Sequence, residues 1–221
     1  MFRHIPNALT ALRLVLAAAF FGMLSYYQYD VSGRHGEIFW LNLAFAVYLI
    51  ALITDFLDGY LARRWKVEGA FGRIVDPFVD KVLVLGSFIF FAGKNFTIPA
   101  HNVGDIPTNV MTITGVVPWM VVVILARELL VTSLRGSSES SGANFGAVFS
   151  GKLKMTLQSI TILVVLVYVN YLPKLQAHGI GHAAALFRDA CIWLTLAITI
   201  YSGVGYIRRG VMLYQQRQMT A

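Results

Sequence analysis

The sequence has a single cysteine, Cys191, which lies in an apolar stretch in the last third of the chain. One cysteine excludes an intrachain disulfide and a metal site built from cysteines. The sequence also lacks the alternation of polar and apolar residues that is typical of membrane strands, which argues against a β-barrel. It contains no internal repeat, no coiled-coil heptad and no long low-complexity tract, so repeat and coiled-coil architectures are excluded as well.

Charged residues are scarce and apolar residues abundant. Only 13% of the residues are charged and 57% are hydrophobic, and the mean hydropathy is +0.65. One soluble domain of this length could not bury so much apolar surface. Apolar windows of roughly 20 residues, long enough to cross a bilayer, occur at about residues 8–28, 38–62, 74–93, 111–134, 153–172 and 185–207. The sequence therefore predicts an all-α integral membrane protein, a six-transmembrane-helix bundle that forms a single domain over residues 1–221.

The basic residues predict the topology. Lysine and arginine outnumber acidic residues by 18 to 11, giving a net charge of +7. If residues 63–73 are cytoplasmic, most basic residues lie on that side and few on the other, namely Arg34, Lys94, Lys174 and Arg188. The positive-inside rule then places both termini in the cytoplasm, with a short juxtamembrane segment at residues 2–6. This indicates a multi-pass protein of the cell inner (cytoplasmic) membrane, whose basic excess reflects topology and anion binding rather than nucleic acid.

Four aspartates interrupt the apolar pattern at this side, namely Asp55, Asp58, Asp76 and Asp80. A charged residue deep in a membrane helix costs ~2.5–3.5 kcal/mol, so a positive group must sit among them. Residues three or four apart share a helix face, and the short connection makes the two helices antiparallel neighbours. The four carboxylates should therefore converge. The second of these helices is expected to begin near Arg73, with Pro77 in its first turn.

Oxygen ligands without histidine or cysteine suit hard cations. Mg²⁺ fits best, and Mn²⁺ or Ca²⁺ could replace it. Two such ions about 3.5–4 Å apart are the usual device for phosphoryl transfer. The small residues Gly59, Ala62 and Gly72 would let a ligand approach closely, or would serve helix packing. The alternative for the acids is a solvated edge with ordinary salt bridges, which their regular spacing disfavours.

Two further polar groups are candidates for substrate binding. Asn7, Thr10 and Arg13 recur at intervals of three along one face of the first helix, where they either bind substrate or mark the membrane edge. The Gly/Ser-rich segment 136–151 is either a flexible linker or a loop that folds over a phosphate. It is bracketed by basic residues, namely Arg135, Lys152 and Lys154, and Arg127 lies near one face with Arg135.

The segment from Asp55 to Asp80 resembles a known family. It matches the signature DxxDGxxAR(x8)GxxxDxxxD of the CDP-alcohol phosphotransferases at every fixed position. The segments HIPNALTALRLVL, ARELLVTSLRG and SGKLKM are similar to those of bacterial phosphatidylglycerophosphate synthases. The likeness covers roughly residues 2–160, and later residues carry little beyond hydrophobicity.

The resemblance implies a metal-dependent phosphatidyltransferase that moves the phosphatidyl group of CDP-diacylglycerol to glycerol 3-phosphate and releases CMP. It implies that two Mg²⁺ ions (or Mn²⁺) are held by Asp55, Asp58, Asp76 and Asp80, and that Asp80 also takes the proton of the attacking hydroxyl. The implied CDP-diacylglycerol site comprises Asn7, Thr10, Arg13, Gly59, Ala62, Arg63 and Gly72. The implied glycerol-3-phosphate site comprises Arg127, Arg135, Lys152 and Lys154, with Glu128 expected to pair with one of them. A homodimer is expected by analogy.

The sequence leaves three alternatives open. A related enzyme could use inositol phosphate, or phosphatidylglycerol as in one type of cardiolipin synthase, as its acceptor. A divalent-cation transporter would spread its acids across the membrane depth, whereas here they cluster at one face. An inactive structural relative would not need the intact Asp80.

Overall fold

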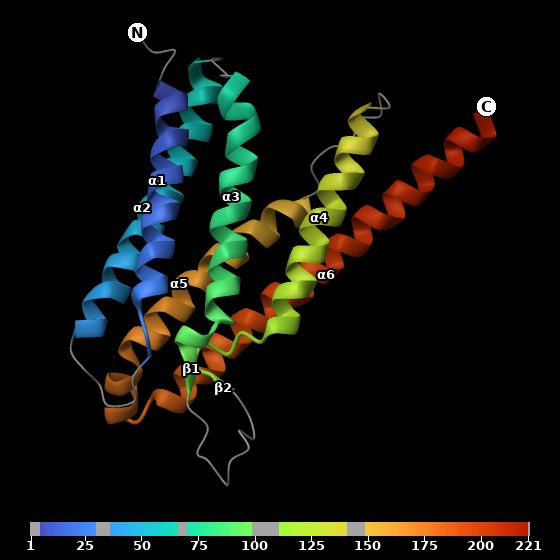
Figure 1. Ribbon diagram of the computed structural model, residues 1–221. Helices are drawn as coiled ribbons and strands as arrows, with labels where there is room; N and C mark the ends of the chain where they lie inside the picture. Colours follow the sequence, from blue (N-terminus) through green and yellow to red (C-terminus); the bar gives the residue numbers. More distant parts are fainter. Residues whose placement is uncertain (1–4, 30–35, 66–69, 99–110, 141–148, 221) are drawn as a thin grey trace.

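The computed structural model describes residues 5–29, 36–65, 70–98, 111–140 and 149–220. Within these ranges six long helices account for most of the chain (Figure 1). They are α1 (Ile5–Tyr26), α2 (Gly36–Trp65), α3 (Ala70–Phe91), α4 (Pro118–Ser140), α5 (Phe149–Ala177) and α6 (Gly181–Thr220). The predicted all-helical class is confirmed.

Four of these helices are long and apolar enough to cross a membrane, by length and composition. They comprise Ala8–Tyr26 of α1, Ile38–Asp58 of α2, Leu153–Ala177 of α5 and Gly181–Met212 of α6. The two remaining helices carry more charge, because α4 contains Arg127, Glu128 and Arg135, and the first half of α3 contains its own acids and bases. The chain is thus a helical membrane protein with six helices, four of which qualify as spans within the described residues.

One small element departs from the all-α prediction. After α3 a 3₁₀ turn at Lys94–Phe96 leads into β1 (Thr97–Ile98), which pairs antiparallel with β2 (Met111–Thr112). The Asn95 side chain donates hydrogen bonds to two carbonyls at the end of α1, Leu24 O and Ser25 O, both at 3.0 Å. This end of the bundle is therefore tied together by a segment outside the helices.

The beginning of α3 also differs from the expectation. It starts at Ala70 rather than near Arg73, so Pro77 lies beyond the first turn and the first-turn placement was wrong. Helices α2 and α3 run antiparallel, as expected (Figure 1). The expectation that they are direct neighbours was wrong for the described residues, because each packs against α1 rather than against the other.

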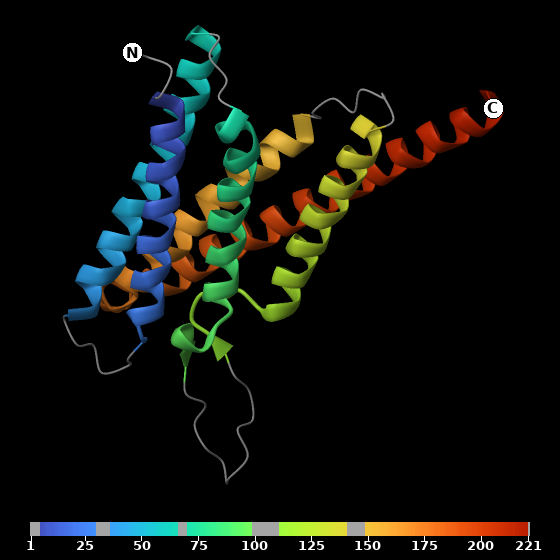
Figure 2. The ribbon, with the colours of Figure 1, turned by 45° about the horizontal axis from the view of Figure 1, so that its top comes forward.

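Helices α1, α2 and α3 stand side by side, while α5 and α6 cross behind them at an angle and α4 leans toward α6 (Figures 1 and 2). Close contact between α1 and α3 depends on Gly86, since a Cβ there would lie 2.3 Å from the Phe21 ring. The Phe21 ring in turn stacks on Phe90 with centroids 5.5 Å apart. Phe20 packs against Tyr48 of α2 at 5.3 Å. These contacts fix α1 against both neighbours and so place its polar residues.

The ends of the helices lie in two groups, at opposite ends of the molecule. The beginning of α1, the end of α2, the beginning of α3 and the ends of α4 and α6 lie toward one end of the molecule (Figures 1 and 2). The two short strands and the turn between α5 and α6 lie toward the other. All four signature aspartates belong to the first end, because they lie in the last part of α2 and the first half of α3.

Candidate active site

A buried arginine joins three of the signature aspartates. Arg13 Nη1 donates hydrogen bonds to Asp55 Oδ1 at 2.5 Å and to Asp80 Oδ1 at 3.0 Å. Its Nη2 donates to Asp58 Oδ2 at 2.9 Å. One guanidinium from α1 thus contacts carboxylates of both α2 and α3. The predicted positive group among the acids is confirmed, and it is Arg13.

The burial of Arg13 explains why it occurs together with the three carboxylates. The side chain of Arg13 is 2% exposed, and those of Asp58, Asp80 and Asp55 are 6%, 25% and 44% exposed. Removing a guanidinium from water is costly unless acceptors replace the lost hydration. The charge-assisted bonds to three carboxylates supply that compensation. Asp58 is the deepest of the three acids and Asp55 lies at the rim.

The donor set fits a hard divalent cation in its chemistry. Oxygen atoms of Asp55 and Asp80 both lie within 3.0 Å of the same Arg13 nitrogen, so carboxylates from two helices surround one positive centre. Such all-oxygen ligands suit Mg²⁺ or Mn²⁺. Among the side chains that the structure describes, no three histidine, cysteine or acidic residues group as metal ligands by themselves. The fourth predicted ligand, Asp76, lies on α3, but its side chain is outside the described part.

A cavity of about 310 Å³ opens beside this cluster, between α1, α2, α3 and α5. Arg13, Asp55 and Asp80 form its charged side, and leucine and valine side chains such as Leu83 and Leu163 form much of the rest. Two hydroxyl residues of α5, Thr156 and Ser159, also line it. The cavity therefore combines a charged end with apolar walls, which suits an amphiphilic ligand.

For most of the remaining predicted site residues, the structure gives only the helix on which they lie. Thr10 is fully buried on α1, one turn before Arg13. The side chains of seven others lie outside the described part of the chain, namely Asn7, Gly59, Ala62, Arg63, Gly72, Asp76 and Lys152. They belong to α1, α2, α3 and α5.

A second polar cluster joins α4, α5 and α6. Glu128 Oε1 accepts hydrogen bonds from Lys154 Nζ and from Arg127 Nη1, the latter at 3.1 Å. The expected pairing of Glu128 with a basic neighbour is confirmed. Three of the predicted acceptor-site residues, Arg127, Arg135 and Lys154, thus lie near one another across two helices.

Residues of α6 complete this cluster. Ser202 accepts a hydrogen bond from Arg127 Nη2 at 2.5 Å, and the Tyr206 hydroxyl accepts one from Arg135 Nη2 at 2.5 Å. Neither residue belongs to the acceptor site predicted from the sequence. The sequence contains a pattern that could have indicated this helix face, because hydroxyl residues recur at Thr195, Thr199 and Ser202 within an apolar stretch.

The two clusters are linked through α3 and α4. Lys81, which directly follows Asp80, donates a hydrogen bond to Thr132 Oγ1 of α4. Thr132 in turn donates to the Glu128 carbonyl at 2.7 Å. The helix of the acidic cluster and the helix of the basic cluster are therefore held next to one another.

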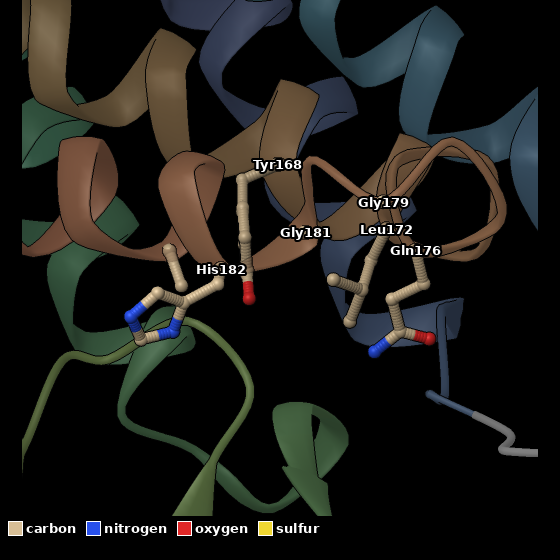
Figure 3. Close-up of a pocket in the computed structure, with 7 residues that line it drawn as sticks. Tyr168, Leu172, Gln176, Gly179, Gly181 and His182 are labelled. Atoms are coloured by element: carbon tan, nitrogen blue, oxygen red, sulfur yellow. The ribbon is translucent and has the colours of Figure 1, made fainter.

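A larger cavity, of about 410 Å³, lies far from both clusters. It forms where α5 ends and α6 begins, with Tyr168, Gln176 and His182 pointing toward it (Figure 3). None of the residues that line it is an acid. Because these lining residues include no acid, this cavity does not contribute to the chemistry of the aspartates.

Fold and site together define a helical membrane protein with carboxylates and a buried arginine beside an amphiphilic cavity. A family model described as CDP-alcohol phosphatidyltransferase matches residues 3–201, so the chain belongs to this family of phosphatidyltransferase enzymes. The match extends well beyond the region of resemblance expected from the sequence.

Curated relatives of this chain have names that agree with one another. A Cereibacter sphaeroides protein named CDP-diacylglycerol–glycerol-3-phosphate 3-phosphatidyltransferase is 26% identical, over 94% of this chain and 95% of its own length. A Bacillus subtilis protein of the same name is 29% identical, over 93% and 94%. A Mycobacterium tuberculosis protein named probable phosphatidylglycerophosphate synthase is 32% identical, over 94% of this chain and 82% of its own.

Proposed function

We propose that this chain transfers the phosphatidyl group of CDP-diacylglycerol to glycerol 3-phosphate, giving phosphatidylglycerophosphate and CMP, in anionic phospholipid biosynthesis. The observation that carries the proposal is the convergence of Asp55, Asp58 and Asp80 on Arg13 beside a cavity with apolar walls, in a chain of this family. The names of the relatives from three bacteria support this acceptor.

The reaction exchanges one phosphorus–oxygen bond for another. The acceptor hydroxyl oxygen bonds to the phosphorus that carries diacylglycerol, and the bond from this phosphorus to the bridging oxygen of the pyrophosphate breaks. CMP leaves with that oxygen. Asp80 takes the hydroxyl proton, a role supported by its partial exposure and its place in the cavity wall.

Asp55, Asp58, Asp76 and Asp80 would hold the divalent cation, Mg²⁺ or Mn²⁺, with two ions expected. When bound, the metal would neutralise the pyrophosphate and polarise the scissile bond. Arg13 contacts three of the same acids, and its fork of donors also suits a phosphate. We therefore assign Arg13, with Thr10, Asn7, Gly59, Ala62, Arg63 and Gly72, to CDP-diacylglycerol.

The basic cluster would bind the phosphate of the acceptor. Arg127, Arg135 and Lys154 supply guanidinium and ammonium donors, and Lys152 lies on α5 two residues before Lys154. The bond between Lys81 and Thr132 places this cluster next to the helix of Asp80. A dianionic acceptor needs such cations, whereas a neutral alcohol would not.

The topology completes the proposal. All six helices would span the membrane, with both termini and the active site on the cytoplasmic side of the inner membrane. The grouping of the helix ends with the aspartates in Figures 1 and 2 supports this orientation. Residues 1–221 would act as one domain, and two copies would form a homodimer.

To test this proposal, purified protein is incubated in detergent with CDP-diacylglycerol, Mg²⁺ and labelled glycerol 3-phosphate. Parallel reactions contain inositol phosphate or phosphatidylglycerol instead. We expect lipid product with glycerol 3-phosphate and little with the others. Product only with another acceptor would reassign the enzyme within the family. No lipid product from any acceptor would refute a transferase, and the cation-transporter alternative would then be tested by metal flux into vesicles.

A further inference from the structure

Helix α6 presents a stripe of hydroxyl side chains to the interior of the bundle. Its members are Thr195, Thr199, Ser202 and Tyr206, each at most 1% exposed. Their spacing of four, three and four residues places them on one helix face. Buried hydroxyls in a membrane helix are costly unless they find partners, so a polar stripe of this kind indicates a specific use.

The last two members of the stripe contact the arginines of the basic cluster. Ser202 accepts a hydrogen bond from Arg127, and the Tyr206 hydroxyl accepts one from Arg135, both at 2.5 Å. The ring of Tyr206 also lies 5.5 Å from Arg127 Cζ and 5.2 Å from Arg135 Cζ. Both distances are within the range of cation–π attraction. One phenol side chain therefore contacts both guanidinium groups.

The spacing of the two arginines on α4 does not by itself bring them to one ligand. They are eight residues apart, a rise of roughly 12 Å along the helix. Each long side chain also has about 2 kcal/mol of rotamer entropy to lose when it becomes ordered. A ring that contacts both guanidinium groups lowers this cost before the ligand arrives, which is preorganisation.

The backbone around Tyr206 leaves room for this arrangement. A Cβ on Gly151, at the start of α5, would lie 3.2 Å from the Tyr206 hydroxyl, and a Cβ on Gly203 would lie 3.1 Å from Arg127 Cγ. Among the described residues, the Nε atoms of Arg127 and Arg135 are buried and have no hydrogen-bond partner. Each arginine thus retains a donor that an anionic ligand could satisfy.

We infer that Tyr206 is a positioning residue for the phosphate of the acceptor. Its ring and hydroxyl hold Arg127 and Arg135 in one arrangement, so that both guanidinium groups face the same anion. The inference rests on the proposed function, since it takes the basic cluster to be the acceptor site. It assigns a role to the last helix, beyond the residues that carry the family signature.

The experiment compares Tyr206→Phe, which keeps the ring, with Tyr206→Leu, which removes both ring and hydroxyl. Tyr201→Phe is the matched control, because Tyr201 lies on the same helix and is 75% exposed. For each protein, kcat and both KM values are measured with CDP-diacylglycerol, glycerol 3-phosphate and Mg²⁺. Thermal unfolding in the same detergent verifies that each variant is folded.

We expect Tyr206→Phe to raise the KM for glycerol 3-phosphate about tenfold, which is typical of losing a hydrogen bond to a charged group. Tyr206→Leu should raise it further. The KM for CDP-diacylglycerol should stay unchanged, and kcat should stay within about twofold of the wild-type value. The reason is that a contact remote from the reacting atoms stabilises the bound substrate and the transition state equally. Tyr201→Phe should match the wild type in all three constants.

Two outcomes would overturn the inference. In one, both Tyr206 variants match Tyr201→Phe while the wild-type protein is active. In the other, kcat and both KM values change together, which would indicate a structural role only. If Tyr206→Leu does not fold, the Tyr206→Phe comparison decides alone. A wild-type protein that makes no lipid from glycerol 3-phosphate would instead refute the proposed function itself, and the inference with it.

Discussion

Replacing Glu128 with glutamine tests the energetics of the basic cluster most sharply. The change keeps the shape of the side chain and removes its charge. In the native protein Glu128 pairs with Lys154 and Arg127, and the three side chains are only 10%, 4% and 8% exposed. Removing one member of such a buried ion pair leaves an uncompensated charge and costs about 3–5 kcal/mol. We therefore expect Glu128→Gln to lower the free energy of unfolding by that amount.

The assay is equilibrium unfolding in mixed micelles with increasing denaturing detergent, applied to a double-mutant cycle. Lys154→Met removes the buried ammonium together with its need for a partner, so the double variant should recover most of the lost stability. Its activity should stay low, because Lys154 is a proposed ligand of the acceptor phosphate. Asp189→Asn serves as control. Asp189 is 43% exposed, and its partner Arg188, at 11%, keeps a hydrogen bond to Ile113 O, so we expect a cost of only ~0–1 kcal/mol.

Either of two results would contradict this role of Glu128. If Glu128→Gln costs no more than the Asp189 control, the cluster is not held by buried charge. If the losses of the two single variants simply add in the double variant, Glu128 and Lys154 are not energetically coupled.

Three further predictions concern the site and the fold. Asp80→Asn should lower kcat by ~10²–10⁴ while CDP-diacylglycerol still binds; turnover near the wild-type value would assign the base elsewhere. Arg135→Ala should raise the KM for glycerol 3-phosphate more than that for CDP-diacylglycerol, and equal effects on both would argue for a structural role. Gly115→Ala should cost at least ~1–2 kcal/mol of unfolding free energy without changing kcat, because Gly115 has φ of +75° and a Cβ would lie 2.8 Å from Asp189 Oδ1. An unchanged unfolding free energy for Gly115→Ala would contradict that strain.

The convergence of acids could be predicted from the sequence because it depends on local geometry. Asp55 and Asp58 share a face by helix periodicity alone, and the short connection returns α3 antiparallel to α2. The need for a positive group followed from the cost of burying charge. That Arg13 supplies it could not be predicted, because this depends on how α1 packs against α2 and α3.

Contacts between helices that are distant in the sequence could not be predicted. Tyr206 lies 71 residues from Arg135 along the chain, and their hydrogen bond exists only because α6 packs against α4. Apolar helices can pack on one another in several orders that a single sequence does not distinguish. Helix boundaries were harder still to predict, because α3 begins at Ala70, before the continuous apolar pattern, and contains Pro77 in its interior.

The most direct test of the central claim is the stoichiometry of the reaction catalysed by the purified protein. CMP and lipid product are measured together, with CDP-diacylglycerol and Mg²⁺ present and with glycerol 3-phosphate either present or absent. The account predicts CMP and phosphatidylglycerophosphate in equal amounts, and neither without glycerol 3-phosphate. CMP released at the same rate without glycerol 3-phosphate, or no labelled lipid in its presence, would contradict it.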